Sequence, residues 1–152
     1  MSIRKLAVPH PKASGGLGSG PLVVAGMFRT ASGLGQSVRN VYRALEVAGE
    51  DPIAVDLSSL LNQVDMPTSD VLKPMPRSSN GRLILHVNAP ETYAALRFLR
   101  LRRWHDWRII GYWAWELDRP DPSWLKCSKH LSEIWTHSDF VTTAFKDHVG
   151  VP

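Results

Sequence analysis

The sequence has little of what marks several common classes of protein. It has one cysteine, Cys127, so no disulfide can form within the chain, and this fits a reducing compartment such as the cytosol. No apolar run approaches the roughly 20 residues that a membrane-spanning helix needs. No apolar block follows Arg4 and Lys5 before Pro9, so a secretory signal is not expected. The six histidines show no metal-ligand spacing, so no metal is expected.

What is present is the composition of one globular domain. The chain has 152 residues, of which 43% are hydrophobic and 21% are charged, enough for a core of its own. The formal net charge of +4 permits anionic partners, including nucleotide phosphates, lipid head groups and nucleic acid. Residues 1–20 are interpreted as a flexible leader, because the glycine-rich stretch Ser14–Gly20 follows no strand. The domain is expected over residues 21–152.

Strand and helix patterns alternate along the domain. Short apolar runs predict five strands, at Leu22–Phe28, Ile53–Leu57, Leu83–Val87, Trp107–Trp115 and Glu133–Thr136. Helical patterns lie between and after them, at Val38–Leu45, Glu91–Arg103, Pro122–Leu131 and from a Ser138 cap to a Gly150 stop. Residues 58–80 form a mobile loop or hold a short helix. The alternation predicts a Rossmann-like three-layer α/β/α domain with a mostly parallel sheet of about five or more strands.

Parallel sheets bind ligands beyond the carboxyl ends of their strands, which directs attention to the loops at that edge. The fourth predicted strand leads directly into Trp115 and Glu116 within a tryptophan-rich stretch. Clustered indole rings form either a core seam or the wall of a ligand site. An acid at the end of a buried strand is typical of a site, so Glu116 is the candidate catalytic residue.

A glycine-containing loop at the same edge is the second candidate. Gly33, Leu34 and Gly35 follow a strand and begin a helix, so backbone N–H groups and the positive helix end face an incoming anion together. Arg39 lies one turn further and can add a charged contact. The alternative is that these glycines only permit a tight turn. The loop lacks the third glycine of a dinucleotide site, and no acid has the usual register at the end of the second strand, where Asp56 is the nearest candidate. It also lacks the Gly-Lys-Ser/Thr ending of a nucleoside-triphosphate loop.

Two further features are open to more than one interpretation. The basic segment Arg97–Arg108, which includes Trp104 and Trp107, is interpreted as a solvated face or as a contact for an anionic membrane surface. Nucleic acid is not expected, because the segment matches no nucleic-acid-binding motif. His86, on a predicted buried strand, is favoured as a core residue over a catalytic base.

The order of the motifs resembles a known family. A strand, SGLGQSVRNVYRAL, a strand, HVNAP, IIGYWAWEL, PDPSW and EIWTHSDFV follow one another over residues 22–150. This series is similar to the amino-terminal domain of retaining glycosyltransferases with the two-domain GT-B fold, of the family-4 or group 1 type. The GYWAWEL-to-SDF part is the specific element, whereas the glycine loop alone is weak.

The resemblance implies an acceptor-side domain of a retaining hexosyltransferase that uses a nucleotide-sugar donor without a metal or other cofactor. It assigns Gly33, Leu34 and Gly35 to the donor diphosphate, and Asn88, Trp115 and Glu116 to the sugar acceptor. A role in polysaccharide or glycolipid synthesis follows, in the cytoplasm or at the inner face of the membrane. Many relatives carry a histidine where this chain has Trp-Glu, so no catalytic histidine is transferred.

The family's second domain, which binds the nucleotide sugar, has no counterpart in these 152 residues. The chain alone is therefore expected to show no transferase activity, because the reaction needs two domains closed around the donor. Apolar surface exposed at the domain interface would favour a separate second domain or self-association. The alternative function is a non-catalytic module that binds a glycan, a nucleotide or a partner chain.

Overall fold

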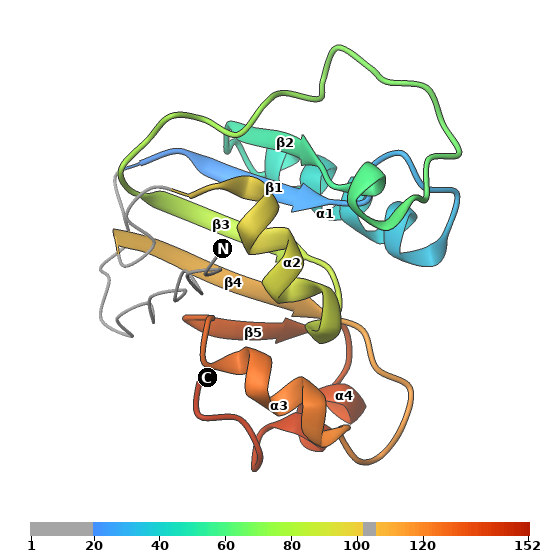
Figure 1. Ribbon diagram of the computed structural model, residues 1–152, viewed down its shortest axis with the longest axis vertical. Coiled ribbons are helices and arrows are strands. Elements are labelled where there is room, and N and C mark those ends of the chain that lie inside the picture. The colour runs from blue at the N-terminus through green and yellow to red at the C-terminus, as the bar shows by residue number, and fades with distance from the viewer. Residues whose placement is uncertain (1–19, 102–105) are drawn as a thin grey trace, which may run out of the picture.

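The computed structural model describes residues 20–101 and 106–152, which form a layered α/β domain (Figure 1). The strands are β1 (Leu22–Gly26), β2 (Pro52–Asp56), β3 (Gly81–His86), β4 (Trp107–Trp113) and β5 (Glu133–Thr136). The helices are α1 (Gly33–Val47), the 3-10 helix η1 (Ser58–Leu61), α2 (Ala89–Leu99), α3 (Pro122–Ser128) and α4 (Asp139–Phe145). The predicted leader lies outside the described residues, except for Gly20.

All five strands run parallel, in the order β2-β1-β3-β4-β5. The chain moves outward from β1 to β2 and then returns past β1 to build β3, β4 and β5 on the other side. The direction therefore changes between β1 and β3, where their carboxyl ends lie side by side. A crevice at such a switch point is the usual ligand site of this architecture.

Helices cover both faces of the sheet, so the predicted three-layer Rossmann-like fold is confirmed. Alternate residues of β1 enter different cores: Val23 belongs to the larger core and Val24 to the smaller, and both are fully buried. Helix α1 contributes Val38 to the smaller core. Helices α2, α3 and α4 contribute to the larger core on the opposite face. A strand buried on both faces explains the continuous apolar run seen in the sequence.

Local signals set most of the element boundaries. Ser32 caps α1 by accepting a hydrogen bond from the Gly35 N–H, and the helix ends before Gly49, whose φ is +84°. Ser138 caps α4 in the same way through the Val141 N–H, as predicted. Residues 58–80 hold the short helix η1, one of the two predicted alternatives.

Several predicted ends are wrong by a few residues. Helix α2 stops at Leu99 because Arg100 adopts a left-handed conformation with φ +46°, so the helix does not continue toward Arg103. Strand β4 stops at Trp113, two residues early. Helix α4 ends at Phe145, where backbone turns take over, and Gly150 is not its stop.

The tryptophan-rich stretch packs into the core and also lines a cleft. Trp113 is fully buried and packs edge-on against Trp124 and Phe145, with ring centroids 5.9 and 5.4 Å apart. Trp115 meets the edge of Trp124 at 4.4 Å. This cluster joins β4, α3 and α4, and so fixes the direction in which the chain leaves the sheet after β4.

Candidate functional site

A cleft of about 1000 Å³ lies at the carboxyl edge of the sheet. Its lining includes five of the predicted site residues, contributed by the loops after β1, β3 and β4: Gly33, Leu34, Asn88, Trp115 and Glu116. Residues up to 83 positions apart in the sequence thus meet in one cavity. The structure brings together the predicted phosphate loop and the predicted acceptor residues.

The first part of the lining is the N-terminus of α1. Ser32 Oγ accepts from the Gly35 N–H at 3.2 Å, and Ser32 O accepts from the Gln36 N–H at 2.9 Å. Among the described residues, the Gly33 and Leu34 N–H groups have no partner. Two backbone donors at the positive end of a 15-residue helix therefore belong to residues that line the cleft.

Gly35 and Arg39 lie outside the cleft lining and support the loop instead. A Cβ added at Gly35 would lie 2.1 Å from the Thr30 carbonyl oxygen, so only glycine fits there. The Arg39 guanidinium donates to the carbonyl oxygens of Phe28 and Thr30 at 2.8 and 3.0 Å. Both bonds use Nη1, so this nitrogen is committed to the loop.

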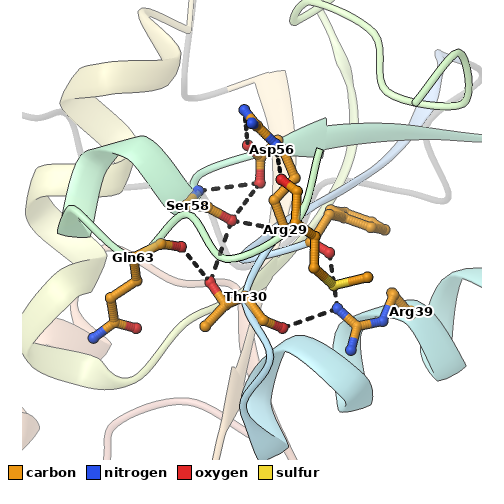
Figure 2. A network of polar contacts seen from close by, with 8 residues as sticks. Arg29, Thr30, Arg39, Asp56, Ser58 and Gln63 are labelled. Atoms are coloured by element: carbon orange, nitrogen blue, oxygen red, sulfur yellow. Dashed lines mark hydrogen bonds and ion pairs between the residues drawn. The ribbon is translucent and has the colours of Figure 1, made fainter. Parts of the chain in front are cut away.

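A polar network, which we call the latch, fastens the β1–α1 loop to the segment after β2 (Figure 2). Asp56 Oδ1 accepts from the Ser58 N–H and hydroxyl at 3.1 and 2.6 Å, and Ser58 Oγ accepts from the Arg29 N–H at 3.0 Å. The Thr30 hydroxyl donates to Gln63 O at 2.7 Å. The Asp56 carboxylate is thus engaged in holding the loop.

The latch includes further contacts, among them the Arg29–Asp56 pair drawn in Figure 2. Asp65 Oδ2 accepts from the Ala31 N–H at 2.9 Å, and Arg29 Nε donates to Met66 O at 2.9 Å. Arg29 also lies 4.0 Å from the Asp56 carboxylate. Bonds from both sides of the loop fix the backbone that leads into Gly33, so the free N–H groups are held in place before a ligand arrives.

Asn88 joins the loops after β3 and β4. Its Oδ1 accepts from the Ala114 N–H at 3.0 Å. Its amide N–H groups have no partner in the described part of the chain, although the residue lines the cleft. Asn88 therefore has donors free for a ligand and an orientation fixed by its acceptor.

Trp115 and Glu116 differ in how firmly they are held. The Trp115 indole is half-buried against Trp124 and donates to Arg119 O at 3.0 Å. Glu116 is exposed and makes no hydrogen bond or ion pair with any described residue. Its carboxylate is accessible from the cleft and is free to accept hydrogen bonds from a ligand.

His86 is a cleft residue as well as a core residue. It is 1% exposed, its Nε2 lies 3.1 Å from Ser37 Oγ, and its ring stacks on Tyr112 at 4.4 Å and 14°. Burial lowers the pKa of His86 to about 4, and a positive charge on His137 acts in the same direction. The imidazole is therefore neutral near pH 7.

The lining residues that sequence reasoning missed include Glu91, Tyr112 and His137. Tyr112 stacks between His86 and His137, with the second pair of ring centroids 6.4 Å apart at 16°. The parallel register could have found this row, since His86 ends β3, Tyr112 is the second-last residue of β4 and His137 directly follows β5. Glu91 lies in the first turn of α2, where an acid also favours the helix.

The described part of the basic segment lies away from this cleft. Helix α2 runs from the carboxyl end of β3 back to the start of β4, so Arg97 and Arg100 lie toward the amino ends of the strands (Figure 1). Trp107 is 2% exposed and Arg108 is paired with Glu133. Residues 102–105 of the segment lie outside the described residues.

Other classes of site find no support in the described residues. No cluster of three or more His, Cys, Asp or Glu side chains is arranged there to hold a metal. No helix of that part of the chain combines the length and the apolar character needed to cross a bilayer.

The fold and the cleft define a Rossmann-like domain with a cavity at the carboxyl edge of its sheet. Comparisons with protein-family models, curated proteins and solved structures find no significant match to the chain. Inference about function therefore starts from the cleft itself.

Proposed function

We propose that the domain is the acceptor-side half of a retaining hexosyltransferase that uses a nucleotide-sugar donor in polysaccharide or glycolipid synthesis. The observation that carries the proposal is a single cleft lined by the free N–H groups of Gly33 and Leu34, the Asn88 amide, and Trp115 with Glu116. These groups suit the two kinds of ligand that such a reaction brings together.

The saccharide side of the proposal rests on the chemistry of three residues. An indole offers an apolar surface to the C–H groups of a sugar ring, and Trp115 is held at the cleft by its bond to Arg119 O. The Asn88 amide donates to sugar hydroxyls and the Glu116 carboxylate accepts from them. In the proposed reaction Glu116 accepts a hydrogen bond from the acceptor hydroxyl and orients it toward the donor sugar.

The donor side rests on backbone groups. Free N–H groups at a helix N-terminus stabilise phosphate oxygens, and the latch keeps these groups at fixed positions. The proposal needs no metal ion. We place the proposed enzyme in the cytoplasm. Its acceptor is a glycan, which in one form of the substrate is linked to a membrane lipid.

Saccharide binding tests the proposal. Intrinsic tryptophan fluorescence and calorimetry are measured with a panel of hexoses, oligosaccharides and nucleotide sugars. Asn88→Asp keeps the acceptor for the Ala114 N–H and removes the two free donors, so it should weaken saccharide binding by about tenfold, the loss of one good hydrogen bond. Trp115→Ala should weaken it further. Trp135→Ala, which removes an exposed indole outside the cleft lining, is the matched control.

The proposal fails if no saccharide binds, or if Asn88→Asp and Trp115→Ala bind saccharides as the wild type does. Transfer of labelled hexose to the bound acceptor is then compared between extracts of cells that produce the wild type or Glu116→Gln. Loss of transfer with Glu116→Gln supports the enzyme. Saccharide binding with equal transfer in both extracts favours the non-catalytic module. The observation that supports this alternative is that Glu116 is exposed and no described residue orients its carboxylate.

A further inference from the structure

The charge of the cleft is unusual for a site that receives phosphate. Within the described residues, its lining contains no lysine and no arginine, while it contains the carboxylates Glu91 and Glu116 and the imidazoles of His86 and His137. With neutral imidazoles the two carboxylates would repel an anion. Attraction must then come from backbone N–H groups, hydroxyls and protonated histidines.

The histidines belong to a continuous row of rings, which we call the ring row: His86, Tyr112 and His137. The ring centroids of His86 and Tyr112 are 4.4 Å apart, and those of Tyr112 and His137 are 6.4 Å apart. The two ring planes of each pair lie within 16° of parallel. Ser37 of α1 contacts this row through His86 Nε2 at 3.1 Å. The row therefore begins beneath the helix whose N-terminus carries the free Gly33 and Leu34 donors.

His86 carries an unsatisfied polar atom. The residue is 1% exposed, and its Nδ1 has no hydrogen-bond partner among the described residues. A buried polar atom left unpaired costs about 1–3 kcal/mol, so such atoms need an explanation in a native structure. A bound ligand that stabilises the protonated His86 ring provides such an explanation.

We propose that the ring row and the N-terminus of α1 form a phosphate subsite that takes up a proton when it is occupied. The phosphate, on the function proposed above, belongs to the nucleotide-sugar donor. The Gly33 and Leu34 N–H groups and the Ser37 hydroxyl bind phosphate oxygens, the two histidines of the ring row lie beside the bound anion, and His86 takes up the proton.

The sign of the pH dependence follows from the groups that face the row. These are Ser37 on α1, Tyr112 on β4, His137 after β5, and the cleft carboxylates Glu91 and Glu116. The free cleft holds His86 neutral, since its pKa is lowered to about 4. A bound anion raises that pKa, so protons are taken up and the affinity rises as the pH falls.

The pyrophosphate probe titrates in the opposite sense. A terminal phosphate loses charge below a pKa of about 6, which weakens its attraction to the protein as the pH falls, whereas the diphosphate of a nucleotide sugar has no terminal phosphate and keeps its charge over this range. Tighter binding at lower pH therefore identifies the protein, rather than the ligand, as the source of the proton linkage.

Calorimetry with inorganic pyrophosphate tests the subsite. Binding is measured at pH 5.5 and pH 7.5, each in two buffers with different ionisation enthalpies. The wild type should bind at least about tenfold more tightly at pH 5.5, as expected for uptake of one proton over at least one pH unit, and the buffers should report proton uptake. His137→Gln, Ser37→Ala and His86→Gln should each reduce both effects. His148→Gln, at an exposed position outside the cleft lining, is the control and should match the wild type.

Equal affinity at the two pH values, absence of binding at both, or wild-type behaviour of His137→Gln and Ser37→Ala overturns the proposal. These two variants keep the test decisive if His86→Gln does not fold. A parallel series with glycerol 3-phosphate separates a donor diphosphate from a phosphorylated acceptor, and tighter binding of the monoester contradicts the donor assignment. Saccharide binding without proton-linked pyrophosphate binding leaves the proposed transferase standing and removes only the subsite. The reverse result retains the subsite and contradicts the transferase.

Discussion

The β1–α1 loop and the loop after β4 both line the cleft, but they are held very differently. Side chains and backbone groups of the latch fix the first loop from both sides. In the second loop, Glu116, Leu117 and Asp118 are exposed. This loop is held mainly by the hydrogen bond from the Ala114 N–H to Asn88 and by that from the Trp115 indole to Arg119 O. A rigid loop suits a group of constant shape such as a phosphate, whereas an adaptable loop suits a ligand whose shape varies.

Two glycines in the first loop should differ most in their response to substitution. Gly35→Ala places a methyl group 2.1 Å from Thr30 O, which Arg39 holds in place, whereas a methyl group at Gly33 would meet nothing within 4 Å. We expect Gly35→Ala to lower the free energy of unfolding by about 3 kcal/mol or more, and Gly33→Ala to change it little. Urea denaturation measures both. Equal stabilities would show that the loop is not rigid.

The pH dependence of stability should come from His86, which lies between the two loops. Its folded-state pKa of about 4 is below the ordinary value of 6.5, so the unfolded chain binds more protons. The contribution of the neutral ring to the free energy of unfolding is fully present above pH 6.5. It falls as the pH drops and is lost by about pH 4. The loss should reach about 3 kcal/mol. Denaturation of His86→Gln over pH 4–7 should show a flatter profile, and an unchanged profile would assign the effect to other groups.

The smallest expected difference in stability is between two carboxylates, one that holds the first loop from the end of β2 and one that lies in the second loop. Asp56→Asn leaves the latch donors with a neutral acceptor and should destabilise the fold by about 1–2 kcal/mol. Asp118→Asn, in the exposed loop, should stay within about 0.5 kcal/mol of the wild type. Hydrogen exchange of the Arg29 and Ala31 amides should rise in Asp56→Asn alone. The same increase in both variants would mean that the latch does not determine the rigidity of the loop.

The sequence was most informative where one local cause determines the structure. Apolar runs predicted the strands along the chain, and the Ser138 cap predicted a helix start, because burial and capping act within a few residues. The lining by Gly33, Asn88 and Glu116 followed from one rule about parallel sheets. The end of α2 at Arg100 was missed, because a left-handed arginine carries no glycine signal.

Long-range contacts were beyond sequence reasoning. The role of Asp56 depends on Ser58 and on Arg29, 27 positions earlier, and the role of Arg39 depends on carbonyl oxygens of the preceding loop. The ring row joins residues of β3 and β4 with the residue that follows β5 through side-chain orientation, which periodicity alone does not give. Such contacts are set by tertiary packing and become visible only in the folded chain.

The central claim is that the carboxyl-edge cleft holds a saccharide next to Trp115 and Glu116. Amide chemical-shift mapping during titration with the tightest-binding saccharide of the panel tests it most directly. The account predicts shifts concentrated at Asn88, Ala114, Trp115 and Glu116, with little change at Arg97 and Arg100 on the opposite edge. Shifts concentrated at that opposite edge, or spread evenly over the domain, would contradict it.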